Sequence, residues 1–161
     1  MDARFNMLGN EIGVKFAKRF ANAGMAIQQS SLPQSTQELV ALRVSQINGC
    51  GWCVDMHIQE AAAAGETAVR LGLVAVWRET TVFTEAERAA LALAEEGTRL
   101  ADAHEGVSDG TWDRVREHFD DDQIAALVSL VALVNAANRL AVIVHQRGGS
   151  YEPGMFAAVL G

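Results

Sequence analysis

The chain has 161 residues, half of them apolar and a fifth charged, with a formal net charge of −7. This length and composition are typical of a soluble globular domain with a sizeable core. An acidic chain without a basic stripe lacks the charge that nucleic-acid binding requires, so we expect no nucleic-acid partner. Residues 1–16 have scattered charges and no continuous apolar segment, which argues against a secretory signal and favours a cytoplasmic location.

Helical periodicity dominates the sequence. Apolar residues recur at three- and four-residue spacing, and no sustained strand-like alternation is present. Alanine and leucine are abundant, and only two prolines occur, which also favours helix. We therefore predict an all-α protein, with residues 1–161 forming a single domain of about seven helices. The expected helices cover residues 10–26, 35–47, 50–65, 66–79, 83–100, 111–119 and 120–145.

Local signals mark several helix ends. Pro33 interrupts the chain after the first predicted helix. Thr84 and Glu87 have the spacing of a capping box, and the acidic residues 120–122 suit the positive end of the last long helix. The longest apolar run, residues 124–134, is shorter than the roughly 20 residues that cross a bilayer. We therefore expect no membrane partner.

The segment "INGCGWCVDMH" at residues 47–57 contains the only two cysteines of the chain. With Cys50 at the start of a helix, Cys53 and His57 lie on the same helix face. In the cytoplasm, such a CxxC pair is more often catalytic or metal-binding than a structural disulfide. A free thiol has a pKa near 8.5, so only about 3% is thiolate at pH 7. We predict that Cys53 is the nucleophile with His57 as its base, because a specific base outweighs a helix dipole that acts mainly on Cys50. Cys50 would then be the resolving thiol.

Glu38 is the candidate partner of the histidine. If the helices on either side of residues 48–49 pack antiparallel, Glu38 returns toward His57 and can hold the imidazole in one tautomer. Ser35 and Glu38 also have capping-box spacing, so the carboxylate could instead cap its own helix. The two roles could alternate, and we favour the proton relay.

The segment "ELVALRVSQINGCGWCVDMH" resembles the alkylhydroperoxidase AhpD-like proteins of the carboxymuconolactone decarboxylase family. The redox members of that family carry a glutamate, a CxxC pair that begins twelve residues later, and a histidine four residues after the second cysteine. Glu38, Cys50, Cys53 and His57 meet this pattern within a core motif region at residues 35–65. A weaker likeness covers "AVWRETTVFTEAERAALALAEEGT" and "VALVNAANRLAV".

This resemblance implies an all-helical homo-trimer or homo-hexamer that acts as a thiol-dependent peroxidase or disulfide oxidoreductase. Cys53 would attack an organic hydroperoxide, Cys50 would close a disulfide, and an external dithiol would reset the pair. His57 and Glu38 would relay the proton, without a bound cofactor or metal. The full-length alkylhydroperoxidase pairs with a peroxiredoxin through a lipoylated donor, a partnership that this shorter chain need not share.

Other interpretations of the same residues remain open. The CxxC pair could serve a redox-sensing or zinc-binding module without turnover, or the chain could be a lactone-decarboxylase-type relative, although that branch generally lacks the CxxC. We interpret Trp52 as a packing residue. We expect the three remaining histidines to be surface or packing residues, and the polar residues of the last helix to form helix-to-helix hydrogen bonds or a subunit contact: His104, His118, His145; Asn135, Asn138, Arg139.

Overall fold

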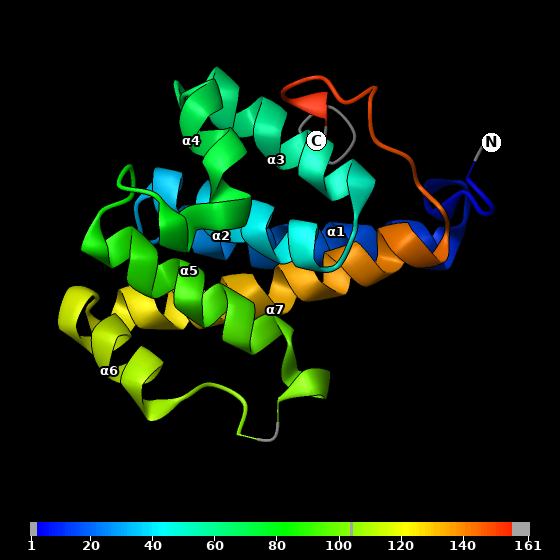
Figure 1. Cartoon of the computed structure of the whole chain (residues 1–161). Helices are drawn as coiled ribbons and strands as arrows, with labels where there is room; N and C mark the ends of the chain where they lie inside the picture. Colours follow the sequence, from blue (N-terminus) through cyan, green and yellow to red (C-terminus); the bar gives the residue numbers. More distant parts are fainter. Residues whose placement is uncertain (1–2, 104, 156–161) are drawn as a thin grey trace.

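The computed structural model describes residues 3–103 and 105–155. Within these ranges the chain is helical and contains no strand, which confirms the predicted all-α class (Figure 1). His104 lies outside the described residues. The elements, in chain order, are η1 (Met7–Gly9), α1 (Glu11–Gln28), α2 (Gln34–Ile47), α3 (Gly51–Ala63), α4 (Ala68–Leu73), η2 (Val74–Glu79), α5 (Glu85–Thr98), η3 (Leu100–Asp102), α6 (Asp109–His118) and α7 (Asp121–Ile143).

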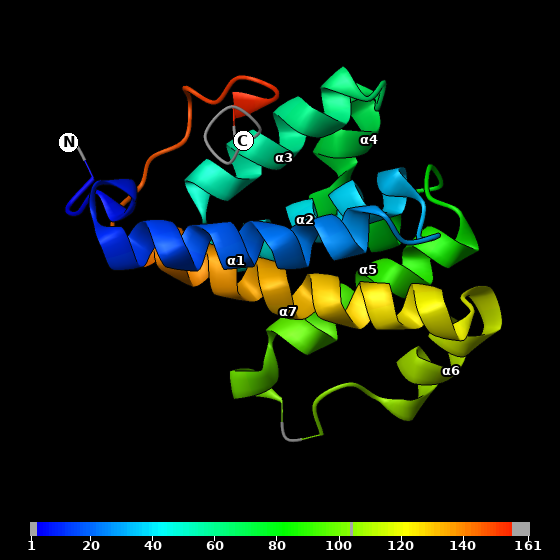
Figure 2. The ribbon, with the colours of Figure 1, turned by 180° about the vertical axis from the view of Figure 1, so that it is seen from behind.

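Helix α2 lies at the centre of the fold and packs against α3, α5 and α7. Its buried side chains divide between two hydrophobic clusters. Val40 and Val44 face a larger cluster with α5, α6 and α7, whereas Leu39 and Leu42 face a smaller one with α3 and the α4–η2 segment. Helices α1 and α7 run side by side, as two opposite views show (Figures 1 and 2). This central position makes α2 the element that connects both cores to the cysteine motif at its end.

The helix starts follow the predicted local chemistry. The Thr84 side chain accepts the backbone N–H of Glu87, and the Glu87 carboxylate accepts the N–H of Thr84, so the predicted capping box is present. Asp120 caps α7 in the same reciprocal way with Gln123. The first-turn residue Asp121 of α7 forms an ion pair with Arg116.

The segment at residues 66–79 differs from the prediction of one continuous helix. It divides into the short α4 and the 3-10 helix η2, with a non-helical residue at Val76 (φ −125°, ψ 29°). Gly72 and a series of β-branched valines give this segment weak helix propensity. Trp77 is buried and its indole N–H donates to Glu95 on α5, at 3.0 Å. The burial of Trp77 and its hydrogen bond to α5 therefore explain why a continuous helix is interrupted here.

Helix α7 has 23 residues, about twice the length of the apolar run at its centre, and is by length and composition long enough to cross a membrane. Its buried residues Leu127, Leu130 and Val134 belong to the larger hydrophobic cluster, and the amide side chain of Asn138 is completely buried. Core helices of globular proteins pass the same test of length and composition. In this fold, α7 contributes one wall of the larger core.

Candidate active site at the Cys50–Cys53 disulfide

The turn between α2 and α3 presents the first cysteine. Gly49 has a φ of 66°, a left-handed conformation that glycine adopts without a side-chain clash, and it reverses the chain after α2. Cys50 is the N-cap of α3, as its predicted place at the start of that helix requires. Its backbone N–H donates to the carbonyl of Ser45 at 3.0 Å, and its sulfur accepts the N–H of Cys53 at 3.2 Å. The Cys50 sulfur therefore lies over the first turn of α3.

Cys50 and Cys53 form a disulfide within this turn, so the structure represents the oxidised protein. The CxxC pair can thus close on itself, as the spacing indicates. Both residues are buried, with 1% and 3% of their surface exposed, and they pack against Ala141 of α7 and Trp52. The disulfide therefore lies at the N-terminal end of α3, where the helix dipole favours a thiolate, and both cysteines are shielded from solvent.

His57 and Glu38 meet across the α2–α3 interface. The imidazole Nδ1 lies 3.0 Å from a carboxylate oxygen of Glu38, and the side chains are 13% and 19% exposed. The N-cap of α2 is Pro33, where no side chain caps the helix, so Glu38 contacts His57 rather than forming the alternative capping box. Because the Glu38 carboxylate accepts a hydrogen bond, it favours the His57 tautomer that carries its proton on Nδ1. The other ring nitrogen, Nε2, is then free to accept a proton. The structure thus brings together two of the predicted pairs, Cys50 with Cys53 and His57 with Glu38.

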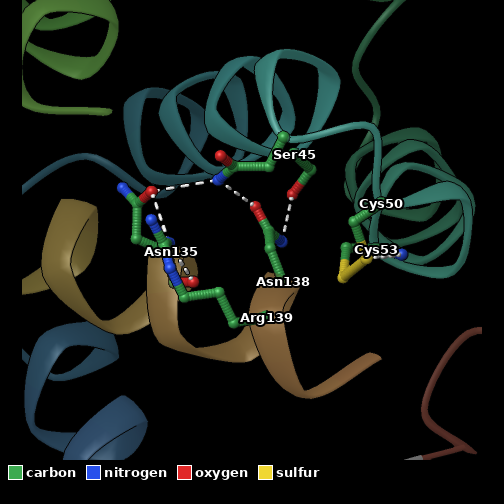
Figure 3. The surroundings of a disulfide bond; sticks show 7 residues. Ser45, Cys50, Cys53, Asn135, Asn138 and Arg139 are labelled. Atoms are coloured by element: carbon green, nitrogen blue, oxygen red, sulfur yellow. Dashed lines mark hydrogen bonds between the residues drawn. A yellow bond between two sulfur atoms is a disulfide. The ribbon is translucent and has the colours of Figure 1, made fainter. Parts of the chain in front are cut away.

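A partly buried network of polar side chains lies next to the cysteine turn (Figure 3). Asn138 donates to the hydroxyl of Ser45 at 3.0 Å and accepts from the side chain of Asn48 at 2.9 Å. Asn48 also donates to Asn135, whose carbonyl groups in turn accept from Arg139 of the same helix. The expected helix-to-helix role is confirmed for the two α7 asparagines. Asn48 lies in the predicted turn before Cys50, but the hydrogen bonds that Ser45 and Asn48 form with α7 were not predicted.

Residues 148–154, which we call the C-terminal strap, return from α7 to α3 (Figures 1 and 2). The carboxylate of Asp55 accepts the backbone N–H groups of Gly149 at 2.6 Å and Tyr151 at 3.0 Å. These two hydrogen bonds hold the pKa of the Asp55 carboxyl below its ordinary value. Glu60, one turn further along α3, accepts from the Tyr151 hydroxyl. The Tyr151 ring also packs edge-on against Trp52 at 5.6 Å, which confirms the predicted packing role of this tryptophan.

Two hollows flank the site. A cavity of about 560 Å³ is lined by the glycines on either side of Cys50 and by side chains of α3 and the α7–strap connection, including Asp55, His145 and Arg147. A smaller hollow of about 220 Å³ lies beside Glu38, near the start of α2 and the end of α3. His145 therefore lines a cavity at the cysteine turn, whereas His118 is exposed at the end of α6. Among the described residues that line the two hollows, neither cysteine nor His57 is present.

The chain belongs to the carboxymuconolactone decarboxylase family, whose model matches residues 15–96. It is 38% identical to the uncharacterized protein YdfG of Bacillus subtilis over 123 residues, which are 76% of this chain and 82% of YdfG. It is 45% identical to the alkyl hydroperoxide reductase AhpD of Rhodopseudomonas palustris over 65 residues, which are 37% of this chain and 35% of AhpD. The match therefore spans about a third of that enzyme.

Solved structures show the same fold. A protein of unknown function from Agrobacterium tumefaciens, ATU0492, for which a role in antioxidant defence as an AhpD has been suggested, superposes with a TM-score of 0.85. It is 31% identical, and the superposition covers 93% of this chain and all of that chain. The debrominase Bmp8 shares the fold alone, with a TM-score of 0.72 and 17% identity over 82% of this chain and 70% of Bmp8. The AhpD-like fold with a CxxC disulfide is consistent with a peroxidase-related role.

Proposed function

We propose that the protein is a thiol-dependent peroxidase that reduces organic hydroperoxides, or disulfides, through Cys50 and Cys53. The observation that carries this proposal is the disulfide at the start of α3, one helix turn from a histidine paired with a carboxylate. The likeness to AhpD enzymes supports the same chemistry. A purely structural disulfide would explain the covalent bond but would not require the His57–Glu38 pair beside it.

The proposed cycle begins with the reduced pair. The Cys53 thiolate attacks the terminal peroxide oxygen, the O–O bond breaks, and the alkoxide takes a proton and leaves as an alcohol. Cys53 is then a sulfenic acid. The Cys50 thiol attacks its sulfur, water leaves, and the disulfide seen in the structure forms. An external dithiol reduces this disulfide through a mixed disulfide, returns both thiols and becomes oxidised itself.

The local hydrogen bonds support this division of roles. His57, held by Glu38, is the group that accepts the Cys53 proton and later returns it. The N–H of Cys53 points at the Cys50 sulfur, at 3.2 Å, and stabilises negative charge there when Cys50 leaves as a thiolate during reduction of the disulfide. We assign no bound cofactor or metal to this cycle.

The likeness to AhpD-like proteins also supports a proposal about assembly and location. We propose a homo-trimer or homo-hexamer that works in the cytoplasm, without a membrane or nucleic-acid partner. Large apolar side chains on α1, such as Ile12 and Phe16, are exposed in the single chain and support association with further copies.

The decisive experiment follows the reduction of cumene hydroperoxide with dihydrolipoamide as the electron donor. Cys53→Ser should abolish turnover, and Cys50→Ser should allow one peroxide per chain. His57→Ala should slow turnover by about 10²–10⁴-fold, as expected for loss of a general base, whereas His118→Ala, at an exposed site on α6, should not. Full activity of Cys53→Ser would show that the nucleophile is wrongly assigned.

The same preparations separate the alternative functions. A zinc module should contain one metal ion per chain by elemental analysis of protein purified without chelator. A redox sensor should change its oligomeric mass once on oxidation and show no repeated turnover. Either result, together with an inactive peroxidase assay, would overturn the enzymatic proposal.

A further inference from the structure

The turn that carries Cys50 is held from behind by one buried side chain of α7. Asn138 has no exposed surface, and both ends of its amide are hydrogen-bonded to the α2–α3 connection (Figure 3). Its N–H group donates to Ser45 in the last turn of α2, and its oxygen accepts from Asn48 at the C-cap of α2. The Asn138 amide therefore forms hydrogen bonds with the α2–α3 connection at two residues, Ser45 and Asn48, which lie close to Cys50 in the chain.

Ser45 connects Asn138 to the backbone of Cys50 through two hydrogen bonds. The carbonyl of Ser45, whose hydroxyl Asn138 contacts, accepts the N–H of Cys50 at 3.0 Å. Ala141, one helix turn beyond Asn138 on α7, packs against both cysteines. Helix α7 thus fixes the position of Cys50 through hydrogen bonds and through packing, although it supplies neither sulfur.

We propose that Asn138 is a positioning residue that sets how readily Cys50 closes on Cys53. This proposal rests on the proposed redox function of the pair, but its central quantity is an equilibrium that can be measured without a peroxide. Disulfide formation depends on the effective concentration of one thiol at the other, which rises as the connecting turn is held in the closed geometry. Release of the Ser45–Asn138–Asn48 hydrogen bonds lets the turn leave that geometry and weakens the disulfide.

A purely structural role would have a different signature. Loss of packing where α7 contacts only the larger core lowers the global stability, but it leaves the cysteine turn untouched as long as the protein is folded. A positioning role changes the thiol–disulfide equilibrium of the folded protein. The reduction potential of the Cys50–Cys53 pair therefore separates the two roles.

The experiment equilibrates the full chain with mixtures of oxidised and reduced dithiothreitol. In this exchange, two protein thiols become a disulfide as one dithiothreitol disulfide becomes two thiols. Asn138→Leu, a side chain of comparable shape without hydrogen-bonding groups, should lower the equilibrium constant for the protein disulfide about tenfold, which raises its reduction potential by about 30 mV. Ser45→Ala, which removes one partner, should shift the potential in the same direction by less.

Val134→Ala is the matched control. Val134 lies one turn before Asn138 on α7 and is buried in the larger core, away from the cysteine cluster. It should reduce stability while leaving the potential unchanged. An unshifted potential in a folded Asn138→Leu protein would overturn the proposal. If that variant does not fold, an unshifted potential in Ser45→Ala would overturn it. A shifted potential in a protein without peroxidase activity would uphold this inference and refute only the proposed function.

Discussion

The buried carboxylate of Glu95 on α5 holds the central helix α2 in place, and its removal gives a quantitative prediction. The Nε of Arg43 on α2 lies 2.7 Å from Glu95, the indole N–H of Trp77 lies 3.0 Å away, and Arg78 forms an ion pair from η2. Glu95 and Arg43 are only 10% and 13% exposed as side chains, whereas Arg78 is 51% exposed. Glu95→Leu would leave a buried guanidinium without its counter-charge.

The expected loss is about 3–5 kcal/mol of unfolding free energy, because removing one partner of a buried ion pair leaves an uncompensated charge. In a chain of this length, this loss lowers the melting temperature by roughly 10 °C. Urea titration followed by circular dichroism measures it. Arg78→Ala, at the exposed partner, should cost only about 1 kcal/mol. The double variant Glu95→Leu/Arg43→Met should recover most of the loss, since it removes both charges. A Glu95→Leu loss below about 1 kcal/mol would refute the assigned role of this cluster.

The same cluster has a pH signature. Burial raises the pKa of Glu95, but the hydrogen bonds from Arg78, Trp77 and Arg43 outweigh burial and hold it below its ordinary value. A lowered pKa means that the ionised form stabilises the fold above the ordinary pKa, and that this contribution is lost as the pH falls through the lowered one. The stability difference between wild type and Glu95→Leu should therefore persist at neutral pH and shrink in strong acid.

Three further predictions concern the site and the strap. Gly148→Ala should lower the free energy of opening the strap by about 1–3 kcal/mol, because the added Cβ would clash with the carbonyl oxygen of Gly51. Amide exchange of the strap should accelerate, whereas Gly51→Ala, whose Cβ would have ordinary contacts, should leave it unchanged. Because the pKa of Asp55 is lowered, the strap amides should be protected from exchange above the ordinary pKa of 3.8, and this protection should be lost as the pH falls through the lowered pKa. Asp55→Ala should remove this pH dependence. In the reduced protein, Glu38→Gln should shift the alkylation of Cys53 to higher pH by mass spectrometry, and an unchanged profile would contradict the proton relay.

The features that the sequence predicted are encoded locally. The cysteines and His57 share a helix face because their spacing follows the helical period, and Glu38 reaches His57 because a short turn joins two packed helices. The capping box at Thr84 depends only on residues within one turn. Such short-range rules specify the helices and the central pairs of the candidate site.

The features that the sequence analysis missed join distant parts of the chain. Asn138 is 90 residues from Asn48, and the strap meets Asp55 across 94 residues at Gly149. Periodicity identifies the buried face of a helix, but it does not determine which helix lies opposite or which polar groups meet. The interrupted helix at residues 66–79 has the same cause, because the indole N–H of Trp77 donates to Glu95 on the distant helix α5.

Because both cysteines are almost completely buried, the rate at which an external thiol reduces the disulfide depends on how often the protein exposes it. An incoming thiolate must approach in line with the S–S bond, so it reacts only while the protein is transiently open. At low reductant concentration the rate rises in proportion to the concentration. At high concentration it reaches a plateau equal to the rate of opening, even though reductant and protein form no stable complex. A levelling curve in such a titration therefore measures a protein motion and should not be converted into a dissociation constant.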